Sequence, residues 1–321
     1  MNSLFKKVLI HAASLYQKAS NSKSILAIET GIINTPVEGA NLLILNRIKS
    51  GLPFMAARFG SGELEIVAIQ HTIHSSNNVI SKSIDYIFGR TPAFWWNVKS
   101  LKILCYINGI FPVNKKIISG FYHEMINSIQ KIDVLASWLK AEQLFETDLL
   151  QAIKIELSDL EPYYHNKPWS IALKGKKVLI VHPFEDTIKM QYQKRELLFD
   201  NPDVLPEFDL ITIKAVQSIA NNNGGYKDWF EALNSMKEKI SAVDFDIAII
   251  GCGAYGMPLA AYVKSLGKQA IHMGGATQIL FGIKGKRWDV SPFFNTLYNE
   301  HWVRPSEIPL NFDKVEGGSY W

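Results

Sequence analysis

The chain has 321 residues, of which 47% are hydrophobic, so it can bury one large core or two smaller ones. Its formal net charge is +4 with cations spread along the chain, which does not indicate the basic stripe of a nucleic-acid-binding protein. That charge suits an anionic small molecule and a weakly anionic membrane surface equally well. Two distant cysteines, Cys105 and Cys252, lack zinc-ligand spacing and favour a reducing compartment without disulfides. No apolar stretch reaches the roughly 18–20 residues that a transmembrane helix needs.

Residues 1–21 predict an amphipathic helix, because apolar side chains recur at helical spacing at Leu4, Phe5, Val8, Leu9, Ala12 and Leu15. Two interpretations stay open. The helix packs on its own protein, or it lies on a membrane surface with help from Lys6, Lys7 and Lys18. We expect residues 22–305 to form a single domain and residues 306–321 a C-terminal tail. The expected location is the cytoplasm, with peripheral contact at the inner face of the cell membrane under the second interpretation.

The first half of the chain predicts mainly helices and one short strand. A helix over residues 39–51 leads to a strand over 54–60 and a second helix over 63–73. Further helices are expected over residues 93–140. Aromatic side chains are dense in that stretch, which is typical of a core, although clustered aromatics also form platforms for sugars.

The second half alternates short apolar strands with helices of about 10–16 residues. Strands are expected at residues 177–182, 208–215, 245–251 and 269–275. This alternation predicts βαβ units, and hence an α/β fold with a Rossmann-like, mainly parallel sheet flanked by helices. Ligands of such folds bind at the carboxyl ends of the strands.

The strand exits carry the unusual residues of this sequence. They read RFGSGE, HPFED, AVQS, GCGAYG and HMGG, and they contain His182 and His272. Turns need glycines but not histidines, so the convergence of these exits predicts a functional site at one edge of the sheet.

Gly251, Gly253 and Gly256 form a G-x-G-x-x-G pattern after a strand and before a helix. Such a turn lets a phosphate approach the N–H groups of the helix N-terminus. An NAD enzyme would place an acid at the next strand end, where this chain has HMGG, so we expect no NAD. A phosphate or nucleotide cradle is favoured, and a purely structural turn stays open.

Two basic positions are candidates for phosphate contact. Arg195 lies four residues after Gln191 on a predicted helix face, and Lys286 lies in the basic loop GIKGKRWD. The alternative for both is an ordinary solvated surface. Glu185 and Asp186 at a helix start are expected to complement the helix dipole or to take part in the site. Cys252 inside the glycine turn is expected to be core, with a reactive thiol as the alternative.

Two segments, ARFGSGELEIV and DIAIIGCGAYGMPLAAYVKSLGKQAIHMGG, resemble the GT-D-fold glycosyltransferases. In that family an R-F-G-D-G-E stretch carries an Asp-x-Glu motif for metal and nucleotide sugar, and a later strand–turn–helix completes the pocket. The resemblance covers roughly residues 50–290. It implies a Rossmann-like sheet, a nucleotide-diphosphate sugar donor, a divalent cation and a role in bacterial surface-polysaccharide or glycoprotein synthesis.

Position by position, Arg58 and Gly60 match the motif and Glu63 matches its glutamate, whereas Ser61 stands where the family has aspartate. A lone glutamate can hold Mg²⁺ or Mn²⁺ with help from substrate phosphates, or act as a general base on an acceptor hydroxyl. Metal dependence therefore stays open. In the later motif His272 occupies the position of the family's strand acid.

The sequence thus predicts a hexosyltransferase that moves a sugar from a nucleotide-diphosphate donor to a glycan or to a lipid- or protein-linked acceptor. The expected catalytic residues are Glu63, His182 and His272, with Glu63 also the metal ligand. The expected donor-binding residues are Arg58, Gly60, Ser61, Gly251, Gly253, Gly256, Arg195 and Lys286. The alternatives are an NAD(P)-dependent oxidoreductase that uses the glycine turn and a non-catalytic nucleotide-sugar-binding module.

Overall fold

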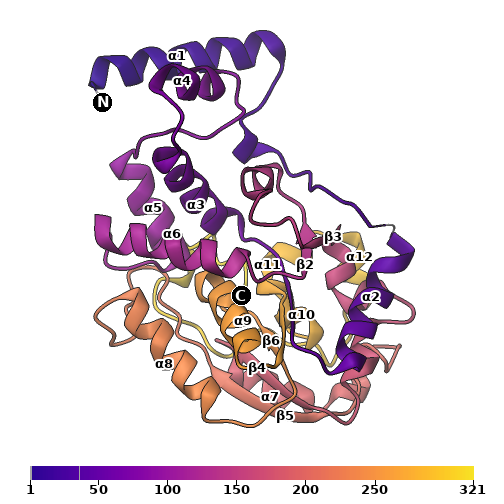
Figure 1. The fold of residues 1–321 in the computed structure, drawn as a ribbon. Coiled ribbons are helices and arrows are strands. Elements are labelled where there is room, and N and C mark those ends of the chain that lie inside the picture. Colours follow the sequence, from indigo (N-terminus) through magenta and orange to yellow (C-terminus); the bar gives the residue numbers. More distant parts are fainter. Residues whose placement is uncertain (1, 36) are drawn as a thin grey trace.

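Within residues 2–35 and 37–321, which the computed structural model describes, seven parallel strands form one sheet in the order β3-β2-β1-β7-β6-β4-β5 (Figure 1). Met1 and Pro36 lie outside the described residues. The strands are β1 (Phe54–Ala57), β2 (Val134–Ser137), β3 (Ile153–Glu156), β4 (Lys177–His182), β5 (Asp209–Lys214), β6 (Ile247–Ile250) and β7 (Gln269–His272). The expected α/β fold with a Rossmann-like parallel sheet is confirmed.

Helices cover both faces of the sheet, because successive residues of each buried strand point to opposite sides. In β1, Met55 and Ala57 join one core cluster, and Phe54 and Ala56 join the other. The longer helices are α1 (Ser3–Ser20), α2 (Val37–Ser50), α3 (Ser61–His74), α4 (Val79–Ile87), α5 (Val98–Asn108), α6 (Lys115–Ile129), α7 (Glu185–Tyr192), α8 (Trp229–Ser241) and α9 (Gly256–Ser265). Three short ones follow: α10 (Thr277–Leu280), α11 (Lys286–Asp289) and α12 (Pro292–Leu297).

The expected elements of the second half are present with small shifts of their bounds, and β4 spans the predicted residues 177–182. The expectation of further helices over residues 93–140 is wrong at its end, because Val134–Ser137 forms β2. All four residues of that strand are buried, so the stretch has no period-2 alternation to separate it from the helix before it. A further short strand, β3, was not predicted.

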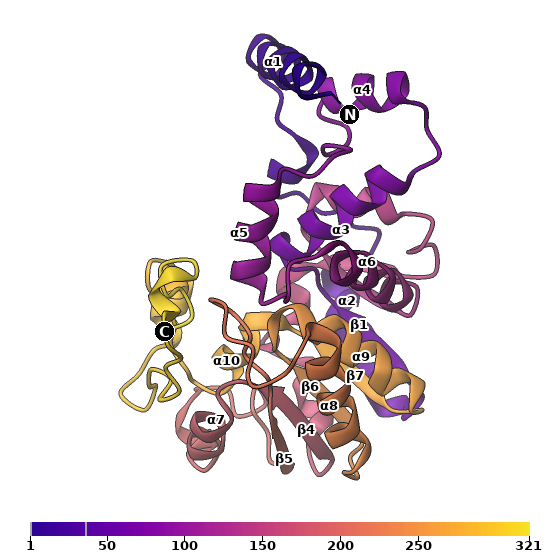
Figure 2. The same cartoon turned by 90° about the vertical axis from the view of Figure 1, so that its left-hand side faces the viewer.

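Helices α1 and α4 pack on each other at a distance from the sheet (Figures 1 and 2). Tyr16 of α1 meets Phe88, just after α4, with ring centroids 4.6 Å apart. The helix expected near the N-terminus is therefore present, and it contacts its own protein through one face. No helix within residues 2–35 and 37–321 combines the length and apolar character needed to cross a bilayer.

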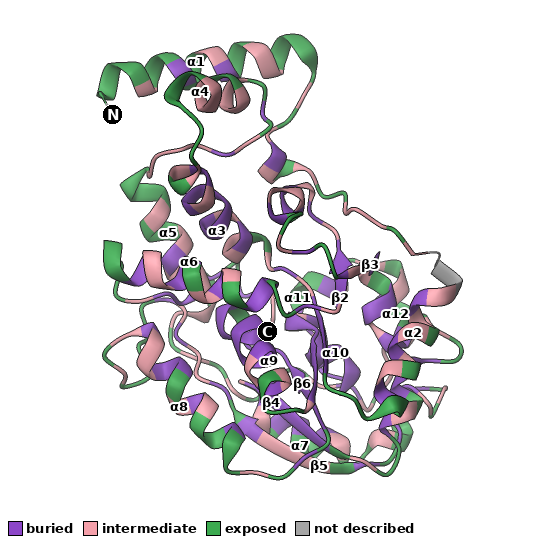
Figure 3. Cartoon of the chain, viewed as in Figure 1, coloured by how far each residue is buried: buried purple, intermediate pink, exposed green. Residues whose placement is uncertain are grey.

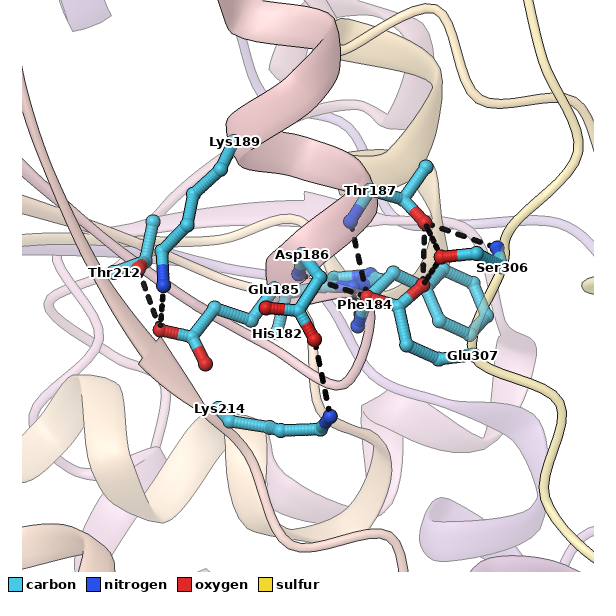
Figure 4. Close-up of polar contacts among 10 residues, drawn as sticks. All are labelled: His182, Phe184, Glu185, Asp186, Thr187, Lys189, Thr212, Lys214, Ser306 and Glu307. Carbon is cyan, nitrogen blue, oxygen red and sulfur yellow. Dashed lines mark hydrogen bonds and ion pairs between the residues drawn. The ribbon is translucent and has the colours of Figure 1, made fainter.

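Residues after position 305, which we set apart as a tail, contact the body of the protein. Glu307 accepts hydrogen bonds from the backbone N–H groups of Asp186 and Thr187 at the start of α7, at 2.8 and 3.0 Å (Figure 4). The same carboxylate accepts from the Thr187 hydroxyl. The anion-binding end of α7 is therefore already filled by a side chain of this chain.

The acids at the start of α7 have structural partners. Glu185 accepts from the Thr212 hydroxyl at 2.6 Å and pairs with Lys189 at 2.8 Å (Figure 4). Asp186 lies 3.4 Å from the Lys214 ammonium. These contacts join α7 to β5, which favours the structural interpretation of both acids.

Candidate functional site

One pocket opens at the carboxyl ends of four neighbouring strands, β1, β7, β6 and β4. The chain leaves β6 towards β7 on one side, whereas it leaves β4 towards β5 on the other. Such a reversal of direction creates the crevice in which α/β proteins bind their ligands. Eight of the residues predicted from the strand exits line this pocket: Arg58, Gly60, Ser61, Glu63, His182, Gly251, Gly253 and His272.

The glycine turn after β6 keeps the floor of the pocket open. A Cβ atom at Gly251 would lie 2.5 Å from the Gly274 carbonyl oxygen and 2.8 Å from Cδ2 of His182, so a side chain has no room there. Gly253 has φ of +55°, a left-handed conformation that favours glycine. The exit of β6 is therefore packed directly against the Gly274 backbone and the His182 ring.

Two helix N-termini in this region have no side-chain cap. Helix α3 begins at Ser61 after Gly60, and α9 begins at Gly256 after the 3₁₀ turn Gly253–Tyr255. At α9 the Gly256 N–H donates to the Gly253 carbonyl oxygen, and at α3 the Glu63 N–H donates to its own carboxylate. The helix dipoles still place partial positive charge at both ends, which favours an anionic group of a ligand.

Two guanidinium groups line the same pocket. The Arg58 guanidinium stacks on the Trp138 ring at 4.8 Å, and Trp138 Nε1 donates to the Phe59 carbonyl oxygen at 2.9 Å. Arg287 lies over the Tyr320 ring at 4.9 Å and donates to its hydroxyl at 2.6 Å. Burial lowers the pKa of Arg58 from its ordinary value. Planar guanidinium groups match the two oxygens of a phosphate.

Glu63 lies in the pocket with its carboxylate folded back over the first turn of α3. A Cβ atom at Gly60 would collide with that carboxylate, which explains the glycine. Burial raises the pKa of Glu63, while a hydrogen bond from its own backbone amide and the nearby Arg58 lower it. Glu63 can therefore both stabilise the start of its own helix and take part in the site. Ser61 is exposed at the pocket edge and offers a hydroxyl.

A divalent cation does not fit the residues present. Among residues 2–35 and 37–321 no group of three His, Cys, Asp or Glu side chains is placed to hold a metal ion. Ser61 brings no charge to neutralise a cation, and the Glu63 carboxylate faces its own helix and Arg58. We derive no step through a metal.

The two histidines are neutral in the folded protein, because burial lowers the pKa of His182 and of His272 to about 3. His182 Nδ1 accepts from the Phe184 amide at 3.0 Å, so Nε2 carries the proton. His272 Nδ1 lies 3.2 Å from the Ile250 carbonyl oxygen, so Nδ1 carries the proton and Nε2 is an acceptor. His182 therefore offers a neutral donor and His272 a neutral acceptor.

Three predicted donor-binding residues do not line the pocket. Gly256 packs against the His272 ring, where a Cβ atom would collide, so its role is packing. Arg195 pairs with Glu196 at 2.9 Å, because α7 ends at Tyr192 and the expected helix face does not continue. Lys286 Nζ donates to the Gly317 carbonyl oxygen at 3.3 Å.

Sequence reasoning missed Glu161, which belongs to the electrostatic surroundings of Arg58. Burial raises the pKa of Glu161 to about 7, opposed by a hydrogen bond from Tyr163 and by the charges of Arg58 and Arg287. The Tyr163 hydroxyl donates to Oε2 at 2.5 Å. Glu161 follows β3, and recognising that strand would have placed its exit at this edge of the sheet.

The thiol of Cys252 also lies at the pocket. Burial raises the pKa of this thiol above its ordinary value, and the negative charge of Glu63 raises it further. A thiol in this state is a weak nucleophile, which favours the core interpretation.

No family model and no curated protein matches this chain. A solved structure of a domain of unknown function, DUF1792, in its selenomethionine-substituted form, is similar at 13% sequence identity and a TM-score of 0.38. The match covers 95% of this chain and 98% of that chain. Because a TM-score this low does not establish a common fold, the functional conclusion depends on the pocket.

Proposed function

We propose that this protein is a glycosyltransferase that uses a nucleotide-diphosphate sugar as donor. The observation that carries the proposal is the meeting of the Arg58 and Arg287 guanidinium groups with the start of α3 and the glycine turn that precedes α9 in one pocket. Two full positive charges and the partial positive charge of the helix dipoles match the charge of a diphosphate. The GT-D-like resemblance of the two segments supports the same donor, and it suggests bacterial surface-polysaccharide or glycoprotein synthesis as the setting.

The proposed reaction needs charge stabilisation on one side and a base on the other. The acceptor oxygen bonds to the anomeric carbon of the sugar, and the bond from that carbon to the diphosphate breaks with its electron pair. Arg58, Arg287 and the helix N–H groups stabilise the charge that develops on the diphosphate. Glu63 takes the proton of the acceptor hydroxyl, a role that its raised pKa favours.

The neutral histidines have binding roles in this proposal. Nε2–H of His182 donates to a diphosphate oxygen without adding charge, and Nε2 of His272 accepts from a hydroxyl of the donor. Burial keeps both rings unprotonated, so neither histidine adds positive charge to the pocket.

A panel of UDP-, GDP-, CDP- and dTDP-sugars tests the proposal. The protein is incubated with each donor and with glycan and lipid-linked acceptors, with Mn²⁺ or with EDTA, and released nucleoside diphosphate is measured. Arg58→Ala and Arg287→Ala are expected to lower the rate about 100-fold or more, as the loss of a charge-stabilising donor does. Arg195→Ala is the matched control, because Arg195 does not line the pocket.

Two outcomes would contradict the proposal. If NADH raises the thermal unfolding temperature while no nucleotide sugar does, the glycine turn belongs to an oxidoreductase. If nucleoside diphosphates bind and no donor turns over with any acceptor, the protein is a binding module, and Glu63→Gln would leave that binding unchanged.

A further inference from the structure

Most residues of the helix pair α1–α4, which comprises residues 2–24 and 75–90, are exposed or partly exposed (Figure 3), and large apolar side chains are among them. Only Leu9 and Ala13 of α1 are buried, and no residue of α4 is. Leu4, Val8 and Leu15 are 68%, 56% and 55% exposed. Contiguous apolar surface of this kind marks an interaction site.

The exposed apolar residues form stripes rather than a scatter. Leu4, Val8 and Leu15 follow one another by four and seven positions, so they share one face of α1, away from the buried Leu9. On α4, Ile80 and Ile84 are four positions apart and 73% and 44% exposed. Each helix therefore has an apolar face that no described residue of this chain covers.

The net positive charge of the protein is concentrated in the helix pair. Lysines are spread along the whole chain, whereas carboxylates are scarce in this pair. Six cations stand in the pair against one carboxylate, Asp85, an excess of five in a chain of net charge +4. Asp85 lies 3.7 Å from Arg90. The rest of the chain is nearly neutral, and the cations of the pair are Lys6, Lys7, Lys18, Lys23, Lys82 and Arg90.

We propose that the α1–α4 pair binds the surface of an anionic lipid bilayer, with the apolar stripes in the interface and the lysines at the headgroups. Lys7 and Lys18 lie three positions after Leu4 and Leu15, on the flank of the stripe, where they reach headgroups as the stripe inserts. Charge complementarity favours this partner over a second copy, since two such pairs would bring like charges together. The proposal is independent of the proposed reaction.

Sedimentation with vesicles tests the proposal. Vesicles of phosphatidylcholine with phosphatidylglycerol are expected to bind the full chain, and pure phosphatidylcholine vesicles to bind it weakly, with binding falling as salt rises. Lys7→Glu with Lys18→Glu is expected to lower partitioning at least about tenfold, since each cation near an anionic surface contributes about fivefold. Lys174→Glu with Lys239→Glu, at exposed positions elsewhere, is the charge-matched control.

The apolar stripe has its own test. L4Q, V8Q and L15Q together are expected to abolish binding while circular dichroism stays unchanged, because the three side chains are exposed and glutamine favours helix. The control triple L150Q, V290Q and L310Q changes side chains that are 70%, 86% and 85% exposed elsewhere. Equal binding to neutral vesicles, or equal loss in both triples, would overturn the proposal. So would a dimer, measured by light scattering, that the stripe triple dissociates.

Discussion

The guanidinium carbon of Arg58 lies 4.8 Å from the centre of the Trp138 ring, and this stacking joins the exits of β1 and β2. Trp138 is fixed in turn by its hydrogen bond to the Phe59 carbonyl oxygen. An arginine held in this way is pre-organised for a phosphate, because less side-chain freedom is lost on binding.

Trp138→Leu is therefore expected to weaken the binding of a nucleoside diphosphate by about tenfold, since a cation–π contact at such a site contributes ~0.5–2 kcal/mol. Trp138→Phe keeps an aromatic face and loses only the hydrogen bond, so its loss should be smaller. Titration calorimetry with UDP and GDP measures both variants. Equal losses would show that stacking on Arg58 is not the cause.

Protonation of the two buried histidines is expected to destabilise the fold in acid. Their pKa is about 3 in the folded state, compared with an ordinary value of 6.5. Between pH 6.5 and pH 3 these histidines are protonated in the unfolded chain but not in the folded protein. The free energy of unfolding therefore decreases as pH falls over that range. Urea denaturation of wild type and of His182→Gln with His272→Gln measures this. The double variant should show a shallower dependence on pH, and parallel curves would refute the assignment.

Glu161 is expected to act in the opposite direction. Its pKa is about 7 when folded, against an ordinary 4.5, so the folded state retains a proton that the unfolded chain releases. Its contribution to stability is present below pH 4.5 and is lost as pH rises to 7. The stability of Glu161→Gln relative to wild type should therefore increase over that range, and taking this difference cancels the histidine effect. Glu156→Gln, at an exposed position of β3, is the control, and a pH-independent difference would contradict the prediction.

Gly251→Ala is expected to damage both stability and binding. The added Cβ meets the Gly274 carbonyl oxygen at 2.5 Å, and a backbone atom in the core cannot move away freely. We expect a loss of about 1–3 kcal/mol, as for other overpacked sites. Gly39→Ala is the control, because its Cβ would meet only a Thr35 methyl group at 3.8 Å. Thermal unfolding that is equal in both variants would rule out the close approach.

The sequence predicted the parts of the fold whose signal is local. Strand β4 has six residues and is bounded by Lys177 and by His182 before a proline, so its apolar run and its limits are both visible. Strands β2 and β3 have four residues each, as β1, β6 and β7 do, but no glycine turn marks where they end.

The candidate site divides in the same way. Glycines and histidines at strand exits are visible because the α/β rule places those exits together. Glu161 and Tyr320 approach Arg58 because segments distant in the sequence pack together, and no local sequence pattern predicts this approach. Arg195 shows the converse error, since its predicted place depended on α7 continuing beyond Tyr192.

The walls of the pocket come from distant parts of the chain, with Arg58 after the first strand and Tyr320 packed on Gly275 from the C-terminal segment. Contacts of such long sequence separation form late in folding, because closing the loop between them costs entropy. During synthesis, the helices and strands of the first half emerge while one wall of the pocket is still untranslated. The protein therefore acquires its ligand site only after the segment that contains Tyr320 has been translated.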